Sequence, residues 1–233
     1  MNRLLVSLLI TFGLVVAADR VSLALTERAV ATQLELSGSL STRPDVSIRG
    51  LPFLTQAIAG EYGDVELSAS QVTAGGARLS QLEVSLRGVH VPLGDALSGA
   101  VDAVPVDRLR ATVVMSYADI TRQLRDRRLT VSPAGDQLRV TGSVQVLGRT
   151  IAASAVSTVA LKGSSVVVTA KRFEVGNGMA SRAVTAALAG RFDFVIRLGT
   201  LPYGLKLTGL DVQPRGVVAT AAATDVTLRR HAA

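Results

Sequence analysis

From Asp45 onward, apolar and polar residues alternate with a period of two. In one such stretch, Val65, Leu67 and Ala69 alternate with polar neighbours. Alternation of the same kind recurs at residues 82–86, 138–146, 151–155, 166–168 and 192–198. Because successive side chains of a strand point to opposite faces, this pattern predicts antiparallel strands with one apolar face. Segments typical of turns separate the stretches, at residues 74–76, 132–136, 162–164 and 213–216.

The first residues differ, because their apolar run is continuous. Asn2 and Arg3 precede a run from Leu4 to Ala18. This organisation is typical of a secretory signal, and Val16-Ala17-Ala18 is an acceptable cleavage triplet. A membrane-spanning helix needs about 20 apolar residues, so the run is short for one; an uncleaved anchor and a buried helix stay open as alternatives. We therefore expect an exported protein in which residues 1–18 form a signal peptide or an N-terminal anchor.

Beyond this run, apolar residues continue at mixed spacings among charged ones, namely Val21, Leu25, Val30, Leu34 and Leu36. The pattern predicts an amphipathic helix from about Asp19 to Leu36, ended by Gly38. Its apolar side is expected to pack on the core. The same side can also line a lipid groove, and the two roles are compatible.

Two short helices are expected between the strands. Ser116, followed three residues later by Asp119, resembles a capping box and predicts a helix with Ile120 and Leu124 on one face. A second helix is predicted from about 178 to 188, stopped by Gly190. The preceding residues 176–178 have two glycines but lack the Lys-Ser/Thr of a phosphate-binding loop.

The composition limits the chemistry that the chain can perform. It has no cysteine, which excludes disulfides, thiolate metal sites and a cysteine nucleophile. Only two histidines are present, His90 and His231, so histidine metal sites and Ser/His/Asp triads have almost no material. The 48% of hydrophobic residues are mainly aliphatic, because aromatics make up only 3%. We expect no catalytic residues, no metal and no cofactor.

The charge favours anionic partners. A net charge of +7 suits nucleic acid, acidic polymers or anionic lipid headgroups. Aromatic residues that could stack on bases are scarce, so no nucleic-acid partner is expected. The densest basic cluster comprises Arg122, Arg125, Arg127 and Arg128. It is either a solvated helix end that offsets the helix dipole or a patch that meets headgroups at a membrane surface, and Asp126 within it weakens the second interpretation.

The segment from Pro44 to Gln56 carries a family resemblance. It reads PDVSIRGLPFLTQ and resembles the signature P-x-V-x-I-x-G-F-P-F-L-T-Q of the LmeA-like phospholipid-binding family, found in bacteria with mycolate-type envelopes. Leu51 stands where the first aromatic residue of that signature is usual. Similar pieces follow in the same order at 88–93, 116–119, 201–205 and 216–226, so the resemblance extends from the export signal to about Leu228.

The resemblance implies an α+β fold similar to tubular lipid-binding proteins. In such a fold, a strongly curved antiparallel sheet is wrapped around a long N-terminal helix. We expect one lipid-binding domain over residues 19–228 and a disordered tail over 229–233. The family offers no agreed catalytic residues, so none are carried over.

Two similar corners are candidates for the mouth of an aliphatic lipid site. Leu51-Pro52-Phe53-Leu54 and Leu201-Pro202-Tyr203 are both Leu-Pro-aromatic steps. An acyl chain needs dry aliphatic walls, and each buried methylene contributes roughly 0.8 kcal/mol. The full set of candidate lipid-binding residues is Leu25, Leu51, Pro52, Phe53, Leu54, Phe192, Phe194, Leu201 and Tyr203. Each of them can equally serve only to pack a β-corner or the core.

Three functions are weighed from the sequence. The leading one is a non-enzymatic binder of phospholipid, and the net charge favours an anionic headgroup. The resemblance implies that such a protein supports the maintenance of mannose-containing glycolipids in the envelope. The second is an adaptor that stabilises a membrane glycosyltransferase, and the third is a hydrolase of envelope lipids. In each case the expected location is a periplasm-like space or the outer face of the cytoplasmic membrane.

Overall fold

The structure of the chain is a computed structural model. It describes residues 2–36, 43–74, 77–98, 101–124, 129–146, 149–163, 165–175, 178–179, 192–197 and 201–229. The helices are α1 (Asn2–Leu36), α2 (Phe53–Ala59), α3 (Leu93–Ser98), α4 (Tyr117–Gln123) and the 3-10 turn η2 (Pro202–Gly204).

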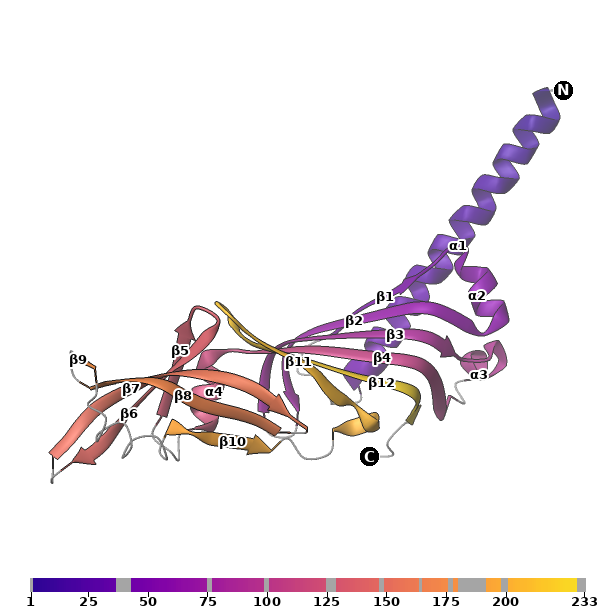
Figure 1. The fold of residues 1–233 in the computed structure, drawn as a ribbon. Coiled ribbons are helices and arrows are strands. Elements are labelled where there is room, and N and C mark those ends of the chain that lie inside the picture. Colours follow the sequence, from indigo (N-terminus) through magenta and orange to yellow (C-terminus); the bar gives the residue numbers. More distant parts are fainter. Residues whose placement is uncertain are drawn as a thin grey trace. The chain divides into compact units, whose positions relative to one another are not determined.

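The strands form two sheets (Figure 1). The six-stranded sheet has the order β1 (Asp45–Arg49), β2 (Glu61–Ala74), β3 (Ala77–His90), β4 (Ala103–Met115), β12 (Gly216–Arg229), β11 (Lys206–Gln213). The five-stranded sheet has the order β10 (Phe194–Arg197), β8 (Ser165–Val175), β7 (Arg149–Lys162), β6 (Gln137–Val146), β5 (Leu129–Ala134), and β9 (Gly178–Met179) pairs with β8. The strand pairs with a described register are antiparallel. The predicted α+β class with an N-terminal helix is confirmed.

The chain divides into two compact units. Unit 1 comprises residues 1–70, 83–111 and 223–233, and unit 2 comprises residues 71–82 and 112–222. The strands β2, β3, β4 and β12 each contribute residues to both units. The described residues contain no strongly curled sheet, and α1 contacts β1 and α2 in unit 1. The described residues therefore do not form a single sheet wrapped around the helix.

Helix α1 is continuous from Asn2 to Leu36, so its end agrees with the prediction, while Gly38 lies outside the described residues. Its packed side differs from the predicted one. Asp19 and Ala31 are buried and Leu23 packs on the core, whereas Val21 and Leu25 are 59% and 60% exposed. Among the described residues, no helix combines the length and the hydrophobicity that a membrane crossing requires.

Each unit has its own core. In unit 1, Phe53 from α2 and Tyr62 from β2 lie with ring centroids 6.2 Å apart, among Ile48, Val89 and Val106. In unit 2, the inward residues of β6, β7 and β8 form an aliphatic layer, as the period of two predicts. This layer contains Leu138, Val140, Ala153, Ala155, Val166 and Val168, all buried.

The two predicted short helices have different outcomes. Helix α4 is confirmed: Ser116 is its N-cap and its side chain accepts a hydrogen bond from the Asp119 backbone N–H. Ile120 and Leu124 pack on the core of unit 2, as predicted. The predicted helix start at Gly178 is wrong, because Gly178 and Met179 pair with Val175 and Glu174 as strand β9. The rest of that predicted helix, residues 180–188, lies outside the described residues.

Candidate functional site

The contact between α1 and α2 depends on a buried carboxylate. Asp19, only 4% exposed, accepts a hydrogen bond from the backbone N–H of Leu54 at 2.8 Å. The residue at the N-cap position of α2 is Pro52, whose side chain makes no capping hydrogen bond. Since the first N–H groups of a helix lack partners within it, Asp19 of α1 takes the capping role for α2. The carboxylate fixes α2 beside the middle of α1.

A second carboxylate of α1 aligns the helix with β1. Glu27 accepts a hydrogen bond from the backbone N–H of Ile48 at 2.8 Å. The Arg43 guanidinium donates to the carbonyl oxygen of Arg28 and to the hydroxyl of Thr32. Glu27 thus adds a second carboxylate to the packed side of α1, whereas the bonds from Arg43 lie at exposed positions of the helix.

The side chains of the first Leu-Pro-aromatic corner, residues 51–54, are divided between the core and the surface. Gly50 has a φ of +112°, and a Cβ there would lie 2.6 Å from the Gln56 Nε2 atom. Only glycine tolerates this conformation and approach without strain. After the corner, Phe53 is 3% exposed in the core of unit 1, whereas Leu51 is 73% exposed, Pro52 is exposed and Leu54 is half-buried.

The second corner lies in unit 2, so the two corners belong to different units. Tyr203 is in the left-handed region with a φ of 56° and is 43% exposed. Pro202 is exposed and Leu201 is half-buried. The corner therefore presents its aromatic ring to solvent, in contrast to Phe53.

The remaining candidate lipid contacts divide between core and surface. Phe192 is fully buried and Phe194 is 7% exposed, and both belong to the core of unit 2. The Phe192 ring meets the Phe173 ring edge to face, with centroids 5.8 Å apart. Leu25 lies on the outward side of α1. Of the candidates in unit 2, the two phenylalanines are the ones placed with the aliphatic layer.

Ser157 is a polar residue in this layer that the sequence interpretation missed. It is fully buried on β7, and its hydroxyl has no hydrogen-bond partner among the described atoms. It lies at a register irregularity, between Val156 and Ser157, in the pairing with β8. The signal was available, because Ser157 continues the inward series of Ala153 and Ala155. A buried hydroxyl without a partner is unfavourable, so it is a candidate contact for a bound molecule.

The basic cluster after α4 is only partly described. Arg122 is exposed and forms an ion pair with Asp119, while Arg125, Arg127 and Arg128 lie outside the described residues. The Ser116 hydroxyl, which donates to the Asp119 carboxylate, and then Arg122 hold the pKa of Asp119 below its usual value, against an opposing effect of burial. The charge of Arg122 is thus compensated within the helix.

Net charge is distributed unequally between the units. Unit 2 has fifteen Lys and Arg against six Asp and Glu, a net charge of +9. Unit 1 has ten against twelve, a net charge of −2. On unit 2, Lys162, Lys171 and Lys206 are exposed and form no ion pair with another described residue. Anionic groups are therefore attracted to unit 2.

The described residues offer few side chains that could act in catalysis or bind a metal ion. His90 Nε2 lies 3.1 Å from the Asp107 carboxylate, and both side chains are exposed. In the ranges that the structure describes, no group of three or more His, Cys, Asp or Glu is placed to hold a metal ion. The arrangement offers aliphatic surfaces with few polar contacts.

A family model agrees with this picture. The model described as LmeA-like phospholipid-binding matches residues 17–222, most of the chain and parts of both units. The chain belongs to this family. The resemblance seen in residues 44–56 is thereby confirmed. Neither the curated proteins nor the solved structures gave a match. Membership of the LmeA-like family implies that the chain binds phospholipid, and the family is described by binding and not by catalysis.

Proposed function

We propose that this LmeA-like protein binds phospholipid without catalysis and holds the acyl chains against the aliphatic interior of unit 2. The observation that carries the proposal is the family match over residues 17–222. Support comes from the buried layer of β6, β7 and β8, which is aliphatic apart from Phe173 and Ser157. Each buried methylene contributes roughly 0.8 kcal/mol. Ten or more buried methylenes therefore give tight binding without a set of specific polar contacts.

The headgroup of the lipid is proposed to be anionic. The net charge of +9 on unit 2 favours it over a zwitterionic headgroup. The proposed headgroup contacts include the arginine cluster Arg122, Arg125, Arg127 and Arg128. Proposed acyl-chain contacts are Phe192, Phe194, Leu201 and Tyr203 in unit 2 and Leu25, Leu51, Pro52, Phe53 and Leu54 in unit 1.

We also propose the cellular setting. Residues 1–18 serve as an export signal or an anchor, and residues 19–228 act as one lipid-binding domain related to tubular lipid-binding proteins. The protein then works in a periplasm-like space or on the outer face of the cytoplasmic membrane. There it supports the maintenance of mannose-containing glycolipids.

Lipid content of the purified full chain tests the proposal. Mass spectrometry of detergent-free protein should detect bound phospholipid at a fixed ratio to protein. Replacing Ala155, which is fully buried and faces the interior of unit 2, by leucine fills space that an acyl chain needs. Ala155→Leu should therefore lower the lipid-to-protein ratio several-fold.

The matched control lies on the same strand. Ala160 is exposed, so Ala160→Leu adds the same atoms outside the interior and should leave the ratio unchanged. Circular dichroism checks that both variants are folded. Equal lipid content in the two variants would place the lipid elsewhere. Protein without phospholipid that also ignores anionic vesicles would refute the binding function itself.

A further inference from the structure

The exposed side of α2 carries no charge and presents two large aliphatic side chains. Leu51, just before the helix, and Ile58, within it, are each 73% exposed, while Phe53 and Ala57 point into the core. Thr55, between them on the outward side, is also exposed. Residues 50–60 contain no Asp, Glu, Lys or Arg. Two large aliphatic side chains thus face outward from an uncharged segment.

This surface is held in place at both ends of α2. The Asp19 carboxylate binds the Leu54 N–H at the N-terminal end. At the C-terminal end, Gly60 has a φ of 71°, and its carbonyl oxygen accepts a hydrogen bond from the Val91 N–H at 2.8 Å. A Cβ at Gly60 would lie 3.0 Å from the Pro92 Cα atom, so a side chain is tolerated poorly there. Leu51 and Ile58 are therefore presented by a fixed backbone.

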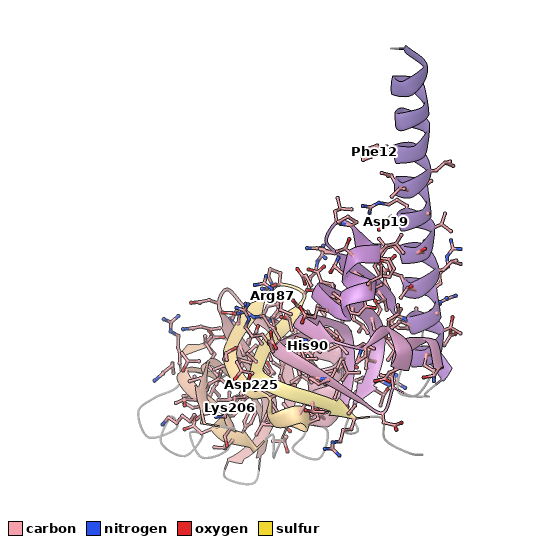
Figure 2. All side chains as sticks on the ribbon, turned by 90° about the vertical axis from the view of Figure 1, so that its right-hand side faces the viewer. Phe12, Asp19, Arg87, His90, Lys206 and Asp225 are labelled. Atoms are coloured by element: carbon pink, nitrogen blue, oxygen red, sulfur yellow. The ribbon has the colours of Figure 1, made fainter. Side chains whose placement is uncertain are left out.

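The neighbouring part of α1 is apolar on every side. Residues 12–18 are all exposed, with Phe12 and Leu14 at 67% and 66%. Figure 2 shows Asp19 where α1 meets the rest of unit 1 and Phe12 farther along the free part of the helix. A helix that is apolar all round is typical of a segment surrounded by protein or lipid. The Asp19–Leu54 hydrogen bond places α2 at the end of this segment.

We propose that α2 rests on a phospholipid bilayer, with Leu51 and Ile58 inserted among the acyl chains beside residues 12–18. Two arginines border the apolar surface. Arg20 and Arg49, next to the two apolar segments in sequence, have side chains 48% and 59% exposed. Arg20 lies 3.9 Å from Asp19, and Arg49 pairs with Glu66 at 2.6 Å, so lipid phosphates compete with these carboxylates for the two cations. Long cationic side chains at such an edge reach headgroups while their stems stay in apolar surroundings.

This inference rests on the proposed function for phospholipid as the chemical partner, and it adds the surface of the protein that touches a phospholipid bilayer. It can be tested directly because the chain has no tryptophan. A single tryptophan introduced by Ile58→Trp in the full chain then reports on α2 alone. The matched control is Val195→Trp, at a 49% exposed position of unit 2. Both proteins are mixed with vesicles of phosphatidylcholine and phosphatidylglycerol whose acyl chains carry bromine, a quencher of tryptophan fluorescence.

The expected result is a blue shift and at least twofold quenching for Ile58→Trp, with little change for Val195→Trp. In a second experiment, the double substitution Leu51→Ser and Ile58→Ser should weaken vesicle binding roughly tenfold, since two large aliphatic side chains lose their apolar surroundings. Val195→Ser should leave binding unchanged, and circular dichroism should show native secondary structure for both.

Several results would overturn the inference. One is an Ile58→Trp emission that stays unshifted and unquenched, whether or not the protein sediments with vesicles. Another is a folded Leu51→Ser and Ile58→Ser protein with full vesicle binding. Lipid content measured on the same samples separates the two proposals. Bound phospholipid without quenching refutes the bilayer contact alone, and quenching without bound phospholipid refutes the proposed lipid storage alone.

Discussion

Units 1 and 2 differ in where they expose apolar groups and where they collect charge. Among the described residues, nine large exposed hydrophobic side chains belong to unit 1 and two, Val195 and Tyr203, to unit 2. Net charge has the opposite distribution, −2 on unit 1 and +9 on unit 2. The net charge of +7 for the whole chain hides the difference in charge, because it describes neither unit.

The difference indicates that the two units have different roles. Apolar surface favours contact with lipid tails or protein, whereas long-range positive charge draws in anionic molecules. The proposals follow this division, with bilayer contact by unit 1 and lipid capture by unit 2. Four predictions test how far the two units differ, from the largest expected effect to the smallest.

The largest effect is expected in the core of unit 2. Phe192→Ala removes a fully buried ring that packs edge to face on Phe173, which should lower the free energy of unfolding by about 3–5 kcal/mol. Urea unfolding measures the loss. Tyr203→Ala, at an exposed ring of the same unit, should change stability by less than about 0.5 kcal/mol.

The same variant tests whether the units unfold together. Because β2, β3, β4 and β12 contribute residues to both units, we expect hydrogen exchange to accelerate at Ile48 and Val106 of unit 1 as well. Unchanged protection of these amides in Phe192→Ala would show that the units unfold independently.

The next effect concerns the carboxylate that caps α2 in unit 1. Asp19→Ala leaves the Leu54 N–H without its partner and should cost about 1–2 kcal/mol of stability. Asp19→Asn keeps an acceptor oxygen and should lose only part of this amount. Thermal unfolding compares the two variants. Equal stability of Asp19→Ala and the unsubstituted protein would mean that the hydrogen bond contributes nothing.

The third effect has the opposite sign. Ser157→Ala removes a buried hydroxyl that lacks a partner among the described atoms, so the lipid-free protein should become more stable by about 1 kcal/mol. Urea unfolding of delipidated protein measures the gain. Adding phospholipid should reduce the gain if the hydroxyl contacts the bound lipid. A loss of stability without lipid would reveal a partner for the hydroxyl within the protein.

The smallest effect concerns charge. Replacing Lys162, Lys171 and Lys206 of unit 2 by glutamine should lower the ratio of anionic to zwitterionic phospholipid in the purified protein about two- to fivefold, because exposed charges are screened by salt. The control neutralises three exposed acidic residues of unit 1, Glu61, Asp95 and Asp102. If the control shifts the ratio by the same factor, the charge difference between the units has no role in lipid selection.

The sheets were predictable from the sequence because their signal is local. Inward and outward residues alternate along each strand, and cross-strand partners such as Val140 and Ala155 are both apolar and both fully buried. The capping residues of α4 were predictable for the same reason, since Ser116 and Asp119 are three positions apart.

The packed side of α1 was not predictable in this way. It contains Asp19 and Glu27, which are polar in sequence but accept hydrogen bonds from Leu54 and Ile48, 35 and 21 residues away. A hydrophobic pattern assigns such residues to solvent. The two Leu-Pro-aromatic corners also differ in a way that the pattern does not predict, because Phe53 turns inward and Tyr203 outward although both follow a Leu-Pro step.

The position of β12 has a consequence for how the molecule is made. This strand lies between β4 and β11 in the six-stranded sheet, although it is the last described element along the chain. A ribosome delivers it after every other described strand, so until then the edges of β4 and β11 that pair with it are open. Premature termination before residue 216 would leave both edges unpaired and open to aggregation or proteolysis. The last described strand is thus the one that joins β11 to the rest of the sheet.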